Sequence, residues 1–343
     1  MFYTGAHVIR VITLPSVSEI GERALIQRIM KHLTPMPDMP IPFWDDASAL
    51  SLGDGRALVV NTDMLVWKTD VPVGMTPFQA ARKAVVMNIS DLAAKGVQPI
   101  AFMPNIGIPP DTSAEDVEEM AKGFEAGARQ YGAYVLGGDT NEACDIVISG
   151  LALGITPEKS IMKRSGGMKP GHKIAVTGKF GLTTAGFKHL LEGVDLLPPV
   201  RQAALESVYM PNARVKEGLA LAKTGAVSGC MDSSDGLSVS LYDMRMSTGF
   251  GFIIDELPIH PLALKFAERK GLDPLSVAMN GGEEYELVFT YPPERETRIK
   301  LAMRDAGCEF IRIGEVTQKK DILYQQNEEL IPIKRGGWDH FHE

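Results

Sequence analysis

One short pattern recurs along this chain and constrains its fold more than any other feature: an apolar run that ends in small polar residues and aspartate. Its fullest form is segment 225–241, where Ala226 and Val227 lead into Asp232 and Asp235, and a glycine then precedes an apolar helical segment. This order predicts a strand, a polar turn and a helix. A core element has no use for such a turn, because an ionised carboxylate removed from water costs several kcal/mol unless a cation or donors meet it. The turn therefore predicts a functional site.

The pattern returns four more times along the chain, and this recurrence favours a shared cation. A single Asp beside a single Ser is more often the cap of the following helix. Hard cations such as Mg²⁺ take oxygen ligands, commonly one or two carboxylates together with phosphate oxygens and water. Several scattered aspartates therefore predict more than one Mg²⁺ and a polyphosphate. The other occurrences are Asp45-Asp46, Asn61-Thr62-Asp63, Asn88-Ile89-Ser90-Asp91 and Gly137-Gly138-Asp139-Thr140.

Composition excludes several classes of protein. The chain has 343 residues, of which 45% are hydrophobic, and a formal net charge of −8. The negative charge argues against a general nucleic-acid surface, because such surfaces concentrate lysine and arginine. No stretch reaches the roughly 18 apolar residues of a membrane span. Three cysteines far apart, without CxxC spacing, favour a reducing compartment. We expect a cytoplasmic protein that binds neither nucleic acid nor membranes.

The first half of the chain alternates predicted strands and helices, and the turn Thr156-Pro157-Glu158 marks its end. We expect an N-terminal α/β domain over residues 1–155 and a C-terminal α+β domain over residues 156–343. Segment 64–73 is expected to continue an extended strand to the next turn.

A long predicted helix carries the third acidic motif, Asn88 to Asp91. Thr76 caps it, Pro77 opens it and Gly96 stops it, so that Asn88 and Asp91 lie three residues apart on one face. Asp91 near the C-terminal end opposes the helix macrodipole by about 0.3–1 kcal/mol unless a cation lies nearby. A bound metal ion would supply that cation, whereas full solvent exposure of Asp91 is the simpler alternative.

Segment 164–171 nearly matches a phosphate loop of the GxxxxGK[ST] kind. His172 stands where the motif requires lysine, and the predicted strand follows the loop instead of preceding it, so the segment is not a Walker A loop. Arg164 remains of interest, because a guanidinium can hold a phosphate through two hydrogen bonds. A lone arginine is more often a solvated surface residue.

Eight motifs taken in order resemble those of the thiamine-monophosphate kinases, within the superfamily of aminoimidazole ribonucleotide synthetase. Each motif alone is weak, but their common order from about residue 18 to the C-terminus is specific. Besides the five segments above, they are Arg164-Ser165-Gly166, Gly281-Gly282-Glu283-Glu284-Tyr285-Glu286-Leu287 and Trp338-Asp339-His340-Phe341.

The resemblance implies a fold, a reaction and a set of site residues. The fold has two domains, and its N-terminal sheet forms a barrel with its twin across a homodimer. The reaction is magnesium-dependent, direct in-line transfer of the γ-phosphoryl group of ATP to thiamine monophosphate, which gives thiamine diphosphate and ADP. The implied catalytic residues are Arg164 and Asp232; the nucleotide positions are Gly138, Asp139, Arg164 and Ser234; the substrate positions include Glu283 and Trp338; and the magnesium positions are Asp46, Thr62, Asp63, Asp91, Asp139, Asp232 and Asp235.

This chemistry agrees with the residues. A phosphate monoester is already largely ionised at neutral pH, with a second pKa of about 6, so the acceptor needs no general base. Catalysis then consists of holding two polyanions in line while Mg²⁺ and Arg164 neutralise the charge between them. Trp338 would stack on the positive thiazolium ring of thiamine, or it belongs to a docked aromatic tail.

Three positions depart from the family pattern. Trp44 replaces the usual glycine before the first acidic pair, and Asn61 replaces the usual serine before Thr62. Asp70 stands where many members carry a substrate-contacting histidine. We expect Lys68 or Asp70 to take over part of substrate binding, or the substrate to differ.

Two alternatives remain beside the kinase. The first is another ATP-using enzyme of the same fold; a selenophosphate synthetase and a hydrogenase maturation factor are disfavoured, because the chain has no cysteine near its N-terminus or at its C-terminal end. The second is a non-catalytic nucleotide-binding paralogue, which the retained carboxylates argue against, since idle clustered carboxylates only repel one another. The sequence leaves open the number of magnesium ions and the role of residues 1–15.

Overall fold

The computed structural model describes residues 15–337. The chain divides into a small unit that contains α1 (Val17–Met30) and a large unit that begins at Pro37 and contains both sheets. In the small unit, the backbone N–H of Ser16 donates to the Glu19 carboxylate at 2.6 Å and so caps α1. No helix within the described residues is long and apolar enough to cross a membrane.

The first sheet of the large unit has the strand order β1-β2-β6-β3-β4, and β5 pairs with β3. The long strands β2, β6 and β3 pair antiparallel, whereas β4 and β5 run parallel to β3. Because β2 and β6 stay in register over eleven residue pairs, they form the rigid centre of the sheet. The strands are β1 (Ser48–Ser51), β2 (Arg56–Val66), β3 (Pro99–Ile108), β4 (Tyr134–Val135), β5 (Asp139–Glu142) and β6 (Val147–Pro157).

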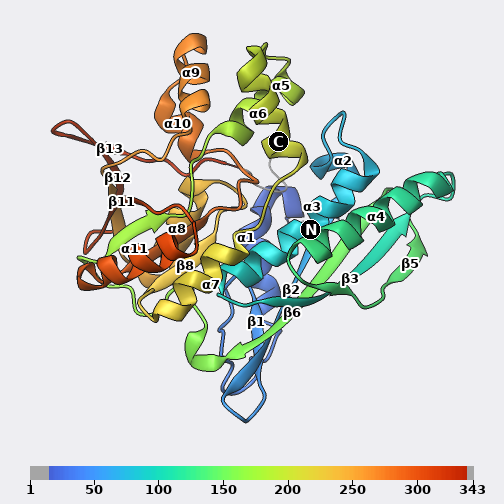
Figure 1. Cartoon of the computed structure of the whole chain (residues 1–343), viewed down its shortest axis with the longest axis horizontal. Coiled ribbons are helices and arrows are strands. Elements are labelled where there is room, and N and C mark those ends of the chain that lie inside the picture. The colour runs from blue at the N-terminus through green and yellow to red at the C-terminus, as the bar shows by residue number, and fades with distance from the viewer. Residues whose placement is uncertain (1–14, 338–343) are drawn as a thin grey trace, which may run out of the picture. The chain divides into compact units, whose positions relative to one another are not determined.

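Helices α3 (Pro77–Ala94) and α4 (Ala114–Gln130) lie against one face of this sheet (Figure 1). The predicted cap of α3 is confirmed, since the Thr76 side chain accepts from the Gln79 N–H and Pro77 occupies the first turn. Strand β2 alternates between the two faces: Val59 is fully buried under the helices, whereas Met64 on the other face is 54% exposed.

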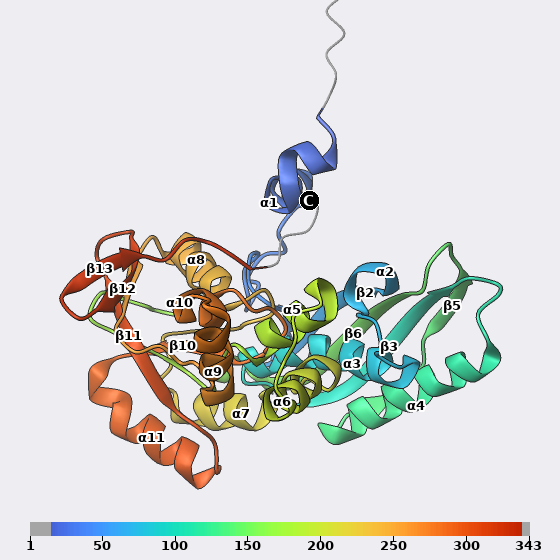
Figure 2. The same cartoon turned by 90° about the horizontal axis from the view of Figure 1, so that it is seen from above.

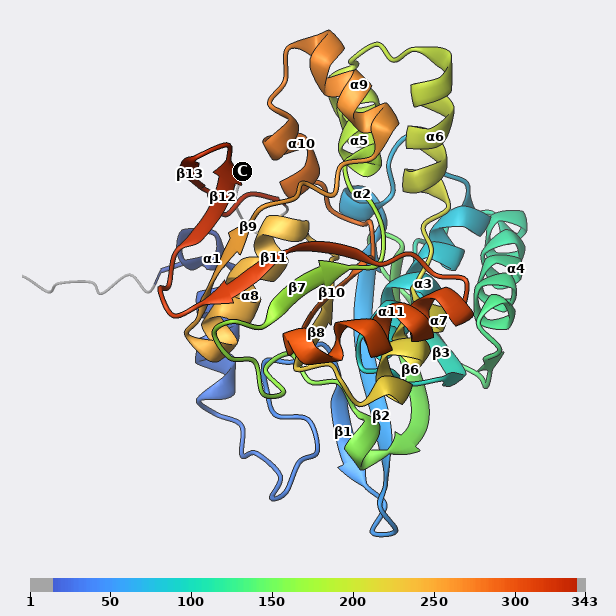
Figure 3. The ribbon, with the colours of Figure 1, turned by 60° about the vertical axis from the view of Figure 1, so that its left-hand side comes forward.

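The second sheet has the order β13-β12-β9-β11-β7-β10-β8, and every neighbouring pair is antiparallel except β12 with β9 (Figure 3). Its buried strands carry apolar runs, as in β10, where all five residues are buried. The strands are β7 (Lys173–Val176), β8 (Gly229–Asp232), β9 (Gly251–Ile254), β10 (Leu287–Tyr291), β11 (Ile311–Thr317), β12 (Ile322–Gln326) and β13 (Glu329–Pro332).

Helices of the second half surround this sheet, and α5, α6, α9 and α10 pack together as a group (Figure 2). Helix α3 joins the two halves: it contacts α7 and β8, and its Ala94 shares a core cluster with Leu287 and Phe289 of β10. Residues of α3 are therefore fixed relative to β8. The helices are α5 (Leu182–Glu192), α6 (Pro198–Tyr209), α7 (Val215–Thr224), α8 (Leu237–Thr248), α9 (Pro261–Lys270), α10 (Pro274–Met279) and α11 (Glu296–Asp305).

The strand, turn and helix predicted for segment 225–241 are confirmed as β8, a four-residue turn and α8. The expectation that segment 64–73 stays extended is wrong. The strand ends at Val66, and the short helix α2 (Trp67–Asp70) follows because the Asp70 carboxylate accepts the Val66 N–H at 2.7 Å and closes a turn. The predicted domain boundary at residue 155 falls near the end of β6 and stays a prediction.

Candidate functional site

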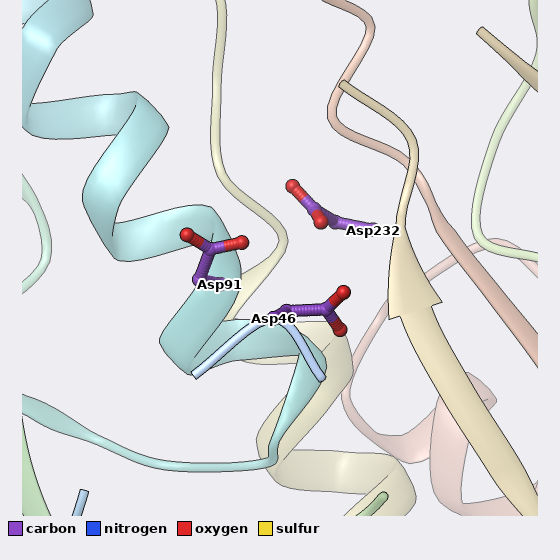
Figure 4. A group of neighbouring side chains, drawn as sticks. All are labelled: Asp46, Asp91 and Asp232. Carbon is purple, nitrogen blue, oxygen red and sulfur yellow. The ribbon is translucent and has the colours of Figure 1, made fainter. Parts of the chain in front are cut away.

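Three carboxylates from separate segments meet between the two sheets. Asp46 comes from the loop before β1, Asp91 from α3 and Asp232 from the end of β8, and all three side chains point into one space (Figure 4). One oxygen of each lies within 4.8 Å of the others. Oxygen ligands in such a group are the donor set that a hard divalent cation takes.

Electrostatics of the three carboxylates show that they fit a cation. Asp232 is only 4% exposed; burial, with the charge of Asp46, raises its pKa to about 7, although Ser90 Oγ donates to it at 2.5 Å. Burial, followed by the charges of Asp232 and Asp46, raises the pKa of Asp91 well above its ordinary value, although the Asn61 amide donates to it at 2.7 Å. The carboxylates therefore resist ionising together, and a bound cation removes that cost.

Asp46 is held by two cations. The Arg164 guanidinium and the Lys95 ammonium both pair with it, with Lys95 Nζ 2.7 Å from Asp46 Oδ2. Burial alone would raise the pKa of Asp46, but Lys95 and Arg164 lower it below its ordinary value. The backbone N–H of Arg164 also donates to Asp45 at 2.9 Å. Arg164 therefore contacts both members of the acidic pair, and its phosphate contact stays a prediction.

Thr62 and Asp63 are neighbours on β2, but their side chains lie on opposite faces of the sheet. Asp63 lies on the same face as Asn61, and its charge contributes to the raised pKa of Asp91. The Thr62 hydroxyl instead donates to the Gly150 carbonyl of β6 at 2.8 Å. Asp63 therefore belongs to the electrostatic surroundings of the three carboxylates, whereas the hydroxyl of Thr62 does not join them. Magnesium binding by either residue stays a prediction.

Gly138 and Asp139 lie where β5 starts. A Cβ on Gly138 would fall 2.1 Å from the Pro104 carbonyl oxygen, so this close approach requires glycine. Asp139 pairs with Asn105 of β3 and is exposed, and it is not among the three carboxylates that converge. The nucleotide and metal roles of Gly138 and Asp139 stay predictions.

The turn between β8 and α8 packs against the loop before β10. Ser234 is exposed, and its carbonyl accepts the Glu283 N–H at 2.5 Å. Asp235 follows in the same turn and is half-buried. A Cβ on Gly282 would lie 3.0 Å from the Ser234 carbonyl oxygen. The double glycine therefore lets the loop that carries Glu283 approach the turn after β8 closely.

Glu283 occupies a strained, half-buried position. Its φ of +64° lies in the left-handed region, which costs a non-glycine residue of order 1–3 kcal/mol. Lys83 of α3 donates to Glu283 Oε1 and to the Asp70 carbonyl, the latter at 2.7 Å. Glu283 Oε2 is buried and accepts no hydrogen bond within residues 15–337. Burial raises the pKa of Glu283. Trp338 lies outside the described residues.

Trp44 precedes the acidic pair with a φ of +69° and is 39% exposed. The left-handed backbone explains why glycine is the residue expected at this position, because glycine alone adopts it without a steric penalty.

Two lysines were missed by sequence reasoning. Lys83 and Lys95 are both fully buried, and both contact predicted site residues. The available signal was a positive charge within the mostly apolar run from residue 80 to residue 95, where a buried lysine requires an anionic partner.

Comparison with known proteins places this geometry in a family. The model of the AIR synthase related protein, N-terminal domain, matches residues 44–156, and that of the C-terminal domain matches residues 169–324. The thiamine-monophosphate kinase of Pyrococcus horikoshii is 35% identical over 298 residues, which cover 86% of this chain and 90% of the relative. That of Nitrosopumilus maritimus is 36% identical, over 83% of this chain and 89% of the relative.

Solved structures agree with these relatives. AaThiL complexed with AMPPCP and TMP superposes with a TM-score of 0.83 at 25% identity, over 96% of this chain and 99% of that chain. The hydrogenase maturation protein HypE of E. coli superposes with a TM-score of 0.67 at 19% identity, over 91% and 97%. This second likeness concerns the fold alone.

Proposed function

Because this chain belongs to the thiamine-monophosphate kinase family, within the AIR synthase related proteins, we propose that it transfers the γ-phosphoryl group of ATP to thiamine monophosphate by direct, magnesium-dependent in-line transfer. The observation that carries the proposal is the convergence of Asp46, Asp91 and Asp232. Phosphoryl transfer requires little covalent chemistry from the protein, so an enzyme of this kind needs a polyphosphate-metal site and a positioned acceptor.

Magnesium would be held by Asp46, Asp91 and Asp232, with Asp63 adding negative charge beside them. Held by these residues, Mg²⁺ would supply positive charge that neutralises the phosphate oxygens. Thr62, Asp139 and Asp235 complete the proposed set of ligands by family resemblance only.

Arg164 would neutralise the transferred phosphate. In the structure its guanidinium forms an ion pair with Asp46, and its Nε is buried and has no acceptor within the described residues. An unused donor next to a charged planar group suits two hydrogen bonds to a phosphate. Gly138, Asp139 and Ser234 are the other proposed nucleotide contacts.

Glu283 would orient the thiamine part of the substrate. Its Oε2 needs a donor, which the amino group on the pyrimidine ring of thiamine supplies, while the thiazolium ring carries a compensating positive charge. Lys83 fixes the other oxygen of Glu283. Asp70 would take part in substrate binding through its backbone carbonyl, which accepts a hydrogen bond from Lys83. Trp338 is the proposed aromatic partner of the thiazolium ring.

The active form is proposed to be a homodimer that buries the uncovered face of the first sheet. This face exposes Leu50, Met64 and Ile155, with 45%, 54% and 41% of each residue accessible. Apolar side chains gathered on a sheet face that no helix covers favour a partner with the same surface. We place the reaction in the cytosol, which the free cysteines Cys144, Cys230 and Cys308 favour.

The test is phosphoryl transfer by the purified protein. ATP, Mg²⁺ and thiamine monophosphate are incubated with the wild type and with Asp232→Asn, and thiamine diphosphate is measured. We expect product from the wild type alone. If neither forms product while ATP still binds with Mg²⁺, the substrate assignment is wrong, and Asp70 and Trp44 are the first positions to examine.

A further inference from the structure

Lys95 is a completely buried lysine beside the three carboxylates. It follows the last turn of α3, and its side chain is 0% exposed. Its ammonium pairs with Asp45, lies 2.7 Å from Asp46 Oδ2 and donates to the Cys230 carbonyl at 3.0 Å. Asp45 and the Cys230 carbonyl each accept a hydrogen bond from the ammonium, and Asp46 adds a second ion pair.

Arg164 and Lys95 neutralise the same carboxylate, but only the Arg164 side chain can turn away from it to another anion. The Arg164 side chain is 14% exposed and comes from a loop, whereas Lys95 is enclosed at the end of a buried helix. Removing Lys95 from its partners would leave an unpaired buried charge, which is strongly unfavourable. Arg164 can therefore exchange Asp46 for a phosphate, and Lys95 cannot.

The position of Lys95 affects the charge balance of the whole site. Two cations, Lys95 and Arg164, face a larger group of carboxylates. When Arg164 turns to a phosphate, Lys95 is the protein cation that remains. Its ammonium is fully enclosed and pairs with both Asp45 and Asp46. The group of carboxylates that Lys95 and Arg164 face consists of Asp45, Asp46, Asp63, Asp91 and Asp232.

We propose that Lys95 is a resident cation that takes the place of a metal ion at the Asp45-Asp46 pair. It holds the loop that carries Asp46 against α3 before magnesium arrives, so that the site is assembled without metal. It also reduces the negative charge that the incoming magnesium experiences. The identity of the metal rests on the proposed function, but the neutralising role of Lys95 does not.

If Lys95 only stabilised the fold through its ion pairs, a different dependence of stability on magnesium would be expected. A lysine at a helix C-terminus also benefits from the helix macrodipole, and its loss would lower stability equally with and without magnesium. A resident cation, in contrast, is replaceable by a divalent cation that binds the same carboxylates. The dependence of stability on magnesium therefore separates the two roles.

The experiment measures thermal unfolding of nucleotide-free protein in EDTA and in Mg²⁺. Lys95→Met keeps the chain length and removes the charge. In EDTA we expect its Tm to fall by at least about 6 °C, and in Mg²⁺ we expect most of that loss to be recovered. Lys122→Met is the matched control, because Lys122 pairs with Glu119 on the surface of α4 and is 64% exposed. The change in Tm between EDTA and Mg²⁺ should be the same for Lys122→Met as for the wild type.

Metal binding is measured in parallel by calorimetric titration with Mg²⁺. Lys95→Met should bind Mg²⁺ at least about tenfold more tightly than the wild type, because one positive charge near the metal is gone. Equal magnesium shifts in Tm for Lys95→Met and the wild type would overturn the proposal. Absence of magnesium binding by the wild type would instead refute the metal site of the proposed function, whatever Lys95 does.

A second variant covers the possibility that Lys95→Met does not fold. Lys95→Met/Asp45→Asn removes one charge of each sign, so that the net charge of the site equals that of the wild type. We expect its magnesium-induced shift in Tm to return to the wild-type value. If both variants stay unfolded in Mg²⁺, Lys95 maintains the fold in a way that no metal ion replaces, and the proposal is wrong.

Discussion

Lys83 of α3 donates to Glu283, which lies 200 residues further along the chain. The same ammonium holds the Asp70 carbonyl at 2.7 Å. One fully buried lysine thus connects the end of α2 to the loop before β10, the two segments for which substrate contacts are proposed.

Lys83→Met should weaken binding of thiamine monophosphate. The substitution leaves the half-buried carboxylate of Glu283 without its cation, so the carboxylate protonates or turns away. We expect the KM for thiamine monophosphate to rise at least about tenfold, equivalent to about 1.4 kcal/mol, while the KM for ATP stays unchanged. Steady-state kinetics with each substrate varied in turn measure this. Lys83→Met/Glu283→Gln is the control, and it should lose no more affinity than Glu283→Gln alone.

Asp70→Ala tests whether the aspartate carries the substrate-binding role of the usual histidine. Its carboxylate accepts the Val66 N–H and closes the turn of α2, so alanine should loosen this turn and shift the carbonyl that holds Lys83. We expect weaker binding of thiamine monophosphate in calorimetric titration, and partial recovery in Asp70→Asn. Unchanged affinity would remove Asp70 from the substrate site.

Asp232→Asn should stabilise the metal-free protein above neutral pH and abolish activity. In the folded chain the pKa of Asp232 is raised to about 7 by burial and by Asp46, above an unfolded value of about 4. The contribution of Asp232 to stability is therefore complete below pH 4 and is lost as the pH rises through 7. In EDTA, the Tm of the variant relative to the wild type should increase between pH 5 and pH 8. A difference that does not change with pH contradicts the raised pKa.

Trp44→Gly should relieve backbone strain. A non-glycine residue in the left-handed region costs about 1–2 kcal/mol, and Trp44 has a φ of +69°. Trp44→Ala removes the ring and keeps the strain. We therefore expect Trp44→Gly to exceed Trp44→Ala in free energy of unfolding by about 1 kcal/mol, measured by urea denaturation. Equal stability of the two variants would mean that the loop relaxes instead of storing strain.

Met64→Glu should dissociate the proposed homodimer into monomers. Met64 is 54% exposed on the uncovered sheet face, and a charge there would have to be buried against the partner. Sedimentation velocity should give a dimer for the wild type and a monomer for the variant. Met246→Glu, on α8 and 53% exposed, is the control and should leave the association state unchanged.

The amino-acid sequence by itself determined the local elements that carry the site. Thr76 and Pro77 start α3, and the segment from Gly225 to Leu241 forms a strand, a turn and a helix, because caps and periodicity depend on residues that are neighbours in the chain. The order of the acidic motifs was also sufficient to identify the family and the reaction of its members.

Tertiary structure alone decided which charges meet. Asp46, Asp91 and Asp232 converge, whereas Asp139, with the same local signature, lies exposed on β5. Lys95 and Lys83 reach partners 50 and 200 residues away. The physical reason is that packing of α3 between the two sheets brings these groups together in a buried place where each charge must find a counter-charge. No local pattern encodes such long-range pairs.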